Sequence, residues 1–172
     1  CTLFDQHDEA GGSLRYETSR DELPLAVLDG EIGLIARMGA SFRFQTTVGH
    51  DTSLEDLRGA FDAVLVAAGP LPADATDWHG LPVAHGHIVI DAATHETAGK
   101  GVFAAGEAVR AGKAVVRLAA DGKTAAECID RYLSGAAIIG SARPFAARVG
   151  RLLEGELDEL MAGLAPEART SR

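Results

Sequence analysis

The sequence contains only two cysteines and no long run of apolar residues, and both shortages exclude kinds of protein. Cys1 and Cys128 lie far apart, so this chain alone cannot build a Cys-x-x-Cys redox pair, a zinc site or an iron–sulfur cluster. We expect Cys128 to be a small buried residue instead. No apolar run approaches the ~18 residues of a membrane span, and the first residues lack the charged and apolar regions of a signal peptide. We therefore expect a cytoplasmic protein without a membrane span.

Positive charge is also scarce, because 16 basic residues face 25 acidic ones and the net charge is −9. A nucleic-acid partner is not expected, since such proteins need a positive surface to displace counterions. Among the six histidines only His85 and His87 are close in sequence, and no carboxylate or cysteine nearby completes a metal site. No Ser-His-Asp or Cys-His nucleophile arrangement is evident either. We predict no metal site and assign no catalytic residue.

What the sequence does contain is an alternation of strand and helix patterns in a chain about one domain long. We predict strands at residues 1–4, 41–46, 62–69, 87–91 and 101–104, a helix that starts at residue 53, and helices at 21–38, 114–133 and 149–164. The apolar run 62–69 is typical of a parallel strand buried on both faces. Residues 70–86 contain three prolines and are interpreted as a connector. The alternation predicts an α/β protein with a mainly parallel sheet.

The predicted helix at 114–133 has the clearest amphipathic pattern. Its expected apolar stripe consists of Val115, Leu118, Ala119, Ala125, Ala126, Ile129 and Leu133.

Three segments at strand ends or in loops are candidates for binding a nucleotide-like ligand. Asp5 closes the first strand, where an acidic residue can accept hydrogen bonds from a ribose; an ordinary polar strand end is the alternative. Gly11 and Gly12 would let the backbone approach a phosphate or a ring, unless they form a plain turn. Ala68 and Gly69 place bare backbone at the carboxyl end of a strand, which is where ligands bind open α/β sheets.

The segment 101–109 is the strongest candidate. A predicted strand ends at Gly106 and Glu107, and after a short loop a long helix begins near Val115 and Val116. The helix N-terminus offers free N–H donors and a partial positive charge, which suit an anionic flavin ring or a phosphate. Glu107 could accept hydrogen bonds from sugar or ribitol hydroxyls. The alternative is a surface loop with a solvated glutamate.

Several short stretches, taken in order, carry a family resemblance over about residues 1–134. They are Gly11-Gly12-Ser13-Leu14-Arg15-Tyr16, Leu23-Pro24, Val48-Gly49, Phe61-Asp62-Ala63-Val64 with Ala67-Ala68-Gly69, Gly101 to Glu107, Val115-Val116 with Asp121-Gly122, and Ile129-Asp130-Arg131-Tyr132-Leu133. Together they resemble the FAD domain of the flavoproteins with two dinucleotide-binding domains, the pyridine nucleotide-disulfide oxidoreductase-like family. The nearest branch is the NADPH-dependent glutamate synthase small subunit.

The resemblance implies a Rossmann-like parallel sheet with flanking helices, FAD as cofactor, and a set of FAD-binding residues. That set is Asp5, Gly11, Gly12, Arg15, Val48, Ala68, Gly69, Gly106, Glu107, Val115 and Val116. In the family pattern, Asp5 would meet the adenosine ribose, and Gly12 and Arg15 would lie near the pyrophosphate or flavin. Val48 would contact adenine, and Ala68 and Gly69 would line the adenine-side entrance. Glu107 would hold the ribitol, and the Val116 N–H would face the flavin pyrimidine.

The chain departs from the family in four ways. The Gly-x-Gly-x-x-Gly turn is absent, the connector 70–86 stands where the family inserts an NADPH domain, Ala68 replaces a threonine, and Glu107 replaces an aspartate. We therefore expect a cut edge at residue 1, a partial FAD-binding domain at 1–134 and a tail with one amphipathic helix at 135–172.

Two functions follow as hypotheses. In the first, the chain is the FAD module of an oxidoreductase, and NAD(P)H acts only through another domain or subunit of a flavin/iron–sulfur enzyme. In the second, the chain is a non-catalytic, degenerate Rossmann-like module with a structural role in a larger complex.

Overall fold

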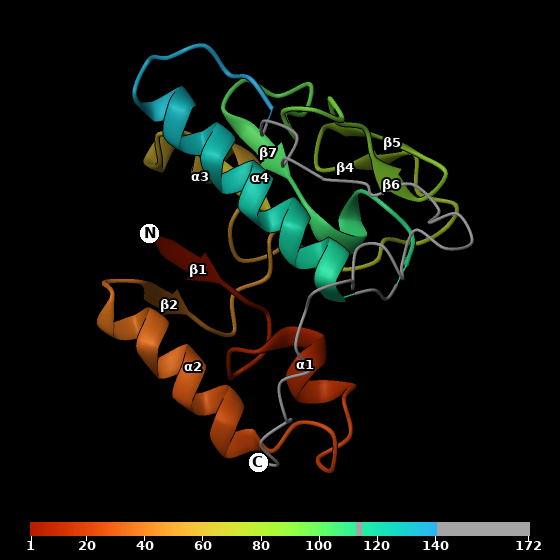
Figure 1. Ribbon diagram of the computed structural model, residues 1–172. Helices are drawn as coiled ribbons and strands as arrows, with labels where there is room; N and C mark the ends of the chain where they lie inside the picture. The colour runs from red at the N-terminus through yellow and green to blue at the C-terminus, as the bar shows by residue number, and fades with distance from the viewer. Residues whose placement is uncertain (113–114, 141–172) are drawn as a thin grey trace, which may run out of the picture. The chain divides into compact units, whose positions relative to one another are not determined.

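The computed structural model describes residues 1–112 and 115–140, which fold into short strands and four α-helices (Figure 1). In chain order the elements are β1 (Thr2–Phe4), α1 (Gly12–Tyr16), α2 (Leu25–Arg37), β2 (Ser41–Arg43), α3 (Leu54–Ala60), β3 (Val64–Val66), β4 (Asp77–Trp78), β5 (Leu81–Ala84), β6 (His87–Ile88), β7 (Val102–Ala104), the 3-10 helix η1 (Gly106–Ala108) and α4 (Val115–Leu133). The predicted mixture of helices and strands is confirmed.

The parallel strands form two separate pairs in the described part of the chain. Strand β1 pairs with β2, and β3 pairs with β7 in the register Val64 to Val102, Leu65 to Phe103 and Val66 to Ala104. No strand pairing joins the two pairs within residues 1–112 and 115–140. The small parallel sheets are compatible with an α/β protein, but they do not confirm a single Rossmann-like sheet.

The connector contains structure that the sequence analysis did not predict. Strands β4, β5 and β6 form an antiparallel sheet, and the strand predicted at 87–91 is its third member rather than part of a parallel sheet. Both hairpins turn through a two-residue His-Gly step with positive φ at both residues, 49° and 90° at His79 and Gly80, and 53° and 75° at His85 and Gly86. This is the conformation of the tight turns that match strand twist, and glycine adopts it without steric cost.

Helix α2 begins four residues after the predicted start at residue 21 and ends one residue before the predicted end, and α3 begins next to the predicted start at residue 53. Pro24 precedes α2, and Gly39 follows it with a φ of 101°, as expected of a glycine that ends a helix. Ser53 caps α3: its hydroxyl accepts a hydrogen bond from the Asp56 N–H at 3.0 Å, and the Asp56 carboxylate accepts from the Ser53 N–H at 3.0 Å. This reciprocal capping box confirms the predicted helix start.

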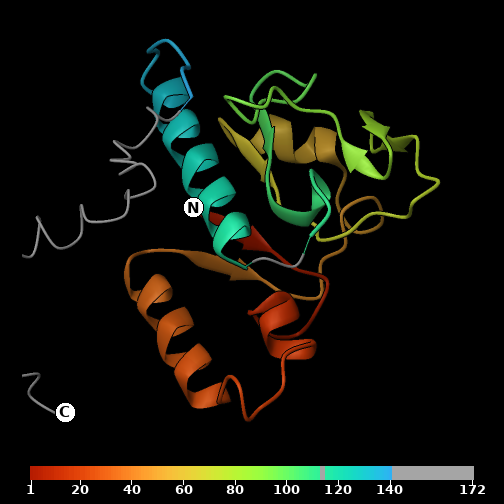
Figure 2. The ribbon, with the colours of Figure 1, turned by 45° about the vertical axis from the view of Figure 1, so that its right-hand side comes forward.

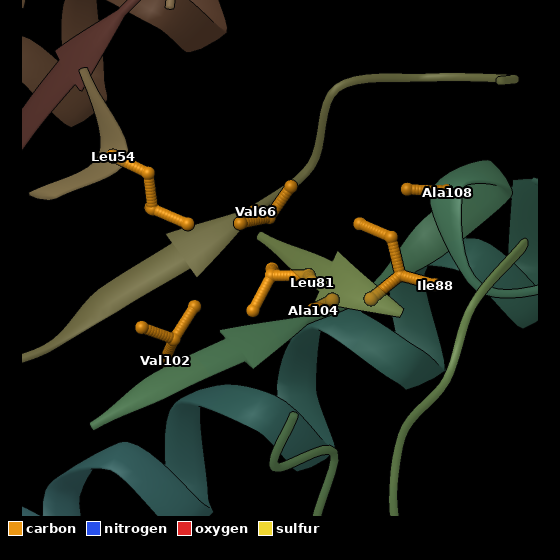
Figure 3. Close-up of a cluster of buried hydrophobic side chains, with 7 residues drawn as sticks. All are labelled: Leu54, Val66, Leu81, Ile88, Val102, Ala104 and Ala108. Atoms are coloured by element: carbon orange, nitrogen blue, oxygen red, sulfur yellow. The ribbon is translucent and has the colours of Figure 1, made fainter. Parts of the chain in front are cut away.

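The core lies around β7. Its three residues are fully buried, and two of them, Val102 and Ala104, pack with side chains from α3, β3, β5, β6 and η1 (Figure 3). The cluster consists of Leu54, Val66, Leu81, Ile88, Val102, Ala104 and Ala108. The prediction that 62–69 is buried on both faces is wrong, because the side chain of Leu65 is 40% exposed. In the described residues β3 pairs only with β7. The side chain of Leu65 points to the opposite face of the strand from Val66, which is part of the core cluster.

Helix α4 packs on β7 and η1 (Figure 2), and the predicted apolar stripe is buried only in part: Ala125 is buried as expected, whereas residues at both ends of the stripe are exposed. The buried residues of α4 are Asp121, Ala125 and Cys128, which recur at steps of four and three. Val115 and Leu133 belong to the predicted stripe, yet they are 58% and 55% exposed. Cys128 is buried as predicted.

The tail predictions fall outside the described residues. The compact unit extends over Cys1–Ser141, and the helix predicted at 149–164 lies beyond it. Among the helices of the described residues, none is long and apolar enough to cross a membrane.

Candidate functional site

The parallel pairing of β3 and β7 brings two of the predicted segments to one edge. Val66 and Ala104 are register partners, and the Ala105 N–H donates to the Val66 carbonyl at 3.0 Å. The residues that follow each strand, Ala68 and Gly69 after β3 and Gly106 and Glu107 after β7, therefore emerge from the same carboxyl edge.

The backbone at this edge is open to a ligand. Gly69 and Gly106 have φ values of 77° and 75°, and a Cβ atom placed on either one would meet no atom within 4 Å. Ala68 is exposed and has only a methyl side chain. A flat or phosphate-bearing ligand could thus reach the main chain here without meeting a side chain.

Glu107 is held at the edge by its backbone. Glu107 lies in η1, and the next residue, Ala108, is fully buried in the core. The Glu107 carbonyl oxygen lies 3.3 Å from the His87 Nδ1 of β6. The Glu107 residue itself is only partly buried. Anchored backbone and a partly accessible carboxylate are the properties expected of a residue that accepts hydrogen bonds from a polyol.

The start of α4 faces the same region, because α4 packs against η1. Val115 and Val116, the first two residues of this 19-residue helix, are 58% and 82% exposed. The N–H groups in the first turn of a helix carry a partial positive charge and attract anions.

One ion pair at this edge involves residues that sequence reasoning missed. The Arg110 Nε lies 2.8 Å from the Asp121 Oδ2, and the Asp121 side chain is 9% exposed while that of Arg110 is 45% exposed. The contact is close, but its angles do not make a hydrogen bond. An aspartate at a helix position flanked by small apolar residues was the signal that could have revealed it.

The Asp5 carboxylate is already bonded to His7, two residues further along the chain. Its Oδ1 accepts a hydrogen bond from the His7 N–H at 2.9 Å and lies 2.8 Å from the His7 Nδ1. The His7 ring stacks on Tyr16 with a centroid distance of 4.4 Å. Partial burial and the hydrogen bond to the Asp8 carboxylate raise the pKa of the Tyr16 phenol above its usual value. Asp5 retains a second carboxylate oxygen for which the structure records no hydrogen bond in the described residues.

Gly11 and Arg15 serve packing within the first 37 residues. A Cβ on Gly11, whose φ is 128°, would lie 3.0 Å from side-chain atoms of both Arg15 and Leu28. The buried Arg15 guanidinium pairs with Asp29 and, at 3.2 Å, with Glu9, and its Nε donates to the Ala10 carbonyl at 2.6 Å. The hydrogen bond to Asp29 is the main cause that raises the pKa of Arg15. Two carboxylates thus neutralise Arg15, which leaves it little charge for a pyrophosphate.

The predicted residues therefore fall into two groups. Ala68, Gly69, Gly106, Glu107, Val115 and Val116 gather around the carboxyl edge of β3 and β7, whereas Asp5, Gly11, Gly12 and Arg15 belong to β1, α1 and the segment between them. Gly12 has a φ of 49° and open space beside it. The partly buried Val48 forms an isolated bridge with Thr52. No strand pairing in the described residues links the two groups.

Two hollows lie at the amino ends of β3 and β7 or beside α3, away from the carboxyl edge. One of about 210 Å³ is lined by residues that include Val64 and Gly101, and one of about 610 Å³ by residues that include Gly49, His79 and Lys100. Arg58 lines both hollows, but its guanidinium is already paired with the Glu55 carboxylate at 2.9 Å. We therefore place the candidate site at the carboxyl edge. In the residues searched, 1–112 and 115–140, no group of three or more potential metal ligands is found.

Comparison with known proteins found no family model that matches the chain. It did find relatives that match over a part. One match is to the glutamate synthase [NADPH] small chain of Mycobacterium tuberculosis, with 38% identity over 82 residues. The matched segment covers 48% of this chain and 16% of the relative. A second match, 37% identical over 68 positions, is to the NAD-dependent dihydropyrimidine dehydrogenase subunit PreT of Escherichia coli, and it covers 40% of this chain and 16% of that subunit. The match to the Escherichia coli glutamate synthase [NADPH] small chain is 33% over 69 positions, 40% of this chain and 15% of the relative.

The chain thus matches about one-sixth of the length of these relatives. Their names point to oxidoreductases that use NADPH or NAD and that are made of more than one kind of chain. This similarity agrees with the family resemblance found in the sequence, at the level of an oxidoreductase-like region.

Proposed function

We propose that the chain is part of the FAD-binding module of an NAD(P)H-linked oxidoreductase, and that it exchanges electrons with another domain or subunit. The observation that carries the proposal is the carboxyl edge of β3 and β7. Four of the eleven predicted FAD-binding residues follow these two strands, and two more begin α4, which contacts η1.

The residues present fit FAD at this edge. The open space next to Gly69 and Gly106 admits a ligand up to the main chain, and the Glu107 carboxylate would accept hydrogen bonds from the ribitol. The exposed first turn of α4, with Val115 and Val116, would donate N–H groups to the pyrimidine side of the ring, where reduction places negative charge. When bound, the flavin supplies the hydride and electron chemistry, while the protein orients it and keeps water away.

Partners are part of the proposal. The matched relatives are named as a small chain and as a subunit, and their names include NADPH or NAD. Large apolar side chains of the described region remain uncovered, among them Val116 at 82% and Met38 at 80% exposure. We take these side chains as candidate contacts with another domain or chain. NAD(P)H would act through that domain or partner.

A structural, FAD-free role is the second candidate, and specific observations favour it. The two parallel pairs do not join into one sheet within the described residues, and Arg15 is neutralised by Glu9 and Asp29. The adenosine half of a FAD site is therefore incomplete in this chain. In this role the chain would hold together a larger complex without taking part in electron transfer.

The absorption spectrum of the purified chain, together with a titration with FAD, separates the two functions. FAD retained by the purified chain would give bands at about 370 and 450 nm; because unbound oxidised flavin absorbs there too, the titration counts only flavin that stays with the protein after free FAD is removed. Replacing Glu107 by Gln should weaken FAD binding about fivefold to tenfold, since the amide oxygen still accepts a hydrogen bond but the bond loses its charge assistance. Glu127→Gln is the matched control on α4, because Glu127 is exposed and its carboxylate lies 4.0 Å from the exposed Lys123. A chain that stays folded but binds no added FAD would refute the flavin role and favour the structural one.

A further inference from the structure

A buried carboxylate in the middle of α4 has no role in the proposed flavin contacts. Asp121 lies on the face of α4 that packs against β7 and η1, next to the fully buried Ala125 one turn later. Only 9% of its side chain is exposed. A carboxylate is expelled from such a place unless a positive group compensates it. The compensating group is the guanidinium of Arg110, with 2.8 Å between Nε and Oδ2.

The two partners belong to the two segments that carry the candidate site. Arg110 is the second residue after η1, which contains Glu107, and its N–H donates to the Gly106 carbonyl at 3.3 Å. Asp121 lies less than two turns after Val115, the first residue of α4. Only about ten residues separate Arg110 from Asp121, so this side-chain contact fixes where the helix starts relative to η1.

We infer that the Arg110–Asp121 ion pair positions two segments of the candidate site. It holds η1 and the first turn of α4 at a fixed separation, so that Glu107 and the start of the helix can bind the same ligand. Neither residue touches the ligand in this arrangement. The inference rests on the proposed function for the identity of that ligand, but the tether itself is a property of the fold.

The pair has an asymmetry that makes it testable. Arg110 is half exposed, so water can solvate it when its partner is lost, whereas Asp121 without Arg110 would be an uncompensated buried charge. Asp121→Asn therefore releases the tether with little damage to the core, while Arg110→Gln disturbs α4 as a whole. Arg110→Lys keeps the charge and should retain part of the tether.

The test uses the full chain and two readouts, amide hydrogen exchange by NMR and the dissociation constant of FAD measured by flavin fluorescence. In Asp121→Asn we expect exchange of the amides of 107–112 and 115–118 to accelerate about tenfold, with the amides of β3 and β7 unchanged, because loss of one close ion pair frees only what it ties down. FAD binding should weaken about tenfold, a coupling of the size typical between a ligand site and residues that position it without touching the ligand. Glu127→Gln, an exposed acid on the same helix, should change neither readout.

Two results would overturn the inference. One is wild-type exchange and wild-type FAD affinity in Asp121→Asn. The other is equal acceleration in β3, β7 and the whole of α4, which would make the pair a contributor to global stability only. If the wild-type chain binds no FAD, the proposed function fails, and the exchange pattern alone then decides whether the tether exists.

Discussion

Phe103 offers the most direct test of the described core. It is the middle residue of β7, its side chain is fully buried, and its ring lies edge-on to Tyr132 of α4 at a centroid distance of 5.8 Å. Phe103→Ala removes a buried aromatic ring between the sheet and the helix. Such a truncation costs about 3–5 kcal/mol, because transfer energy is lost and a cavity remains.

The expected loss of stability in Phe103→Ala has two parts, the buried area of the ring and its contact with Tyr132. The edge-to-face contact with Tyr132 should account for about 0.5–1.5 kcal/mol beyond the buried area. A double-mutant cycle with Phe103→Leu and Tyr132→Leu should recover that coupling, since leucine keeps most of the apolar volume and removes the ring geometry. A domain of this kind is stable by only about 5–15 kcal/mol, so Phe103→Ala leaves it near the limit of folding.

Urea unfolding followed by the fluorescence of Trp78, the single tryptophan, measures these changes. The matched control is Phe44→Ala, because Phe44 is 38% exposed and should cost less than about 1 kcal/mol. A cost below about 1 kcal/mol for Phe103→Ala, with an unchanged urea dependence, would show that β7 is not the centre of the core.

Three further outcomes are expected. Gly49→Ala should be destabilising by about 2 kcal/mol, because its φ is 91° and a Cβ would overlap the His79 ring; in a His79→Asn background the urea midpoint should fall less. Gly11→Ala, at a φ of 128°, should lower the thermal midpoint, which calorimetry would detect. The hydroxyl of Ser53 lowers the pKa of Asp56, so this bond stabilises the fold above about pH 4 and is lost as the pH falls below it. Ser53→Ala should therefore be less stable than wild type at pH 7 in urea unfolding, and an undiminished difference at pH 2 would contradict this explanation.

Local features of the fold were predictable from the sequence. The strand at 101–104, the capping box at Ser53 and the glycine that ends α2 all depend on short-range patterns and on the conformations that single residues allow. The hairpins in the connector were missed because His-Gly is a less familiar turn than Asn-Gly, and because Pro82 argued against a strand.

The candidate site was predictable only in part. Sequence order placed Gly69 and Gly106 at strand ends, and the parallel pairing of β3 with β7 supports bringing them to one edge. The role of Arg15 was different: its partner Asp29 lies 14 residues away on another helix, and no local pattern announces that ion pair. Whether a charge is free for a ligand depends on such distant partners.

The sequence by itself determined where α3 starts, where α2 ends and that strands lie around β3 and β7, since caps, glycines and apolar periodicity act within a few residues. Only the tertiary structure decided which face of α4 is buried. Periodicity favoured a stripe that includes Val115, Ala125 and Leu133; of these three only Ala125 is buried, and the helix also turns Asp121 and Cys128 inward. The buried Asp121 is tolerated because Arg110, brought near by the fold, compensates its charge.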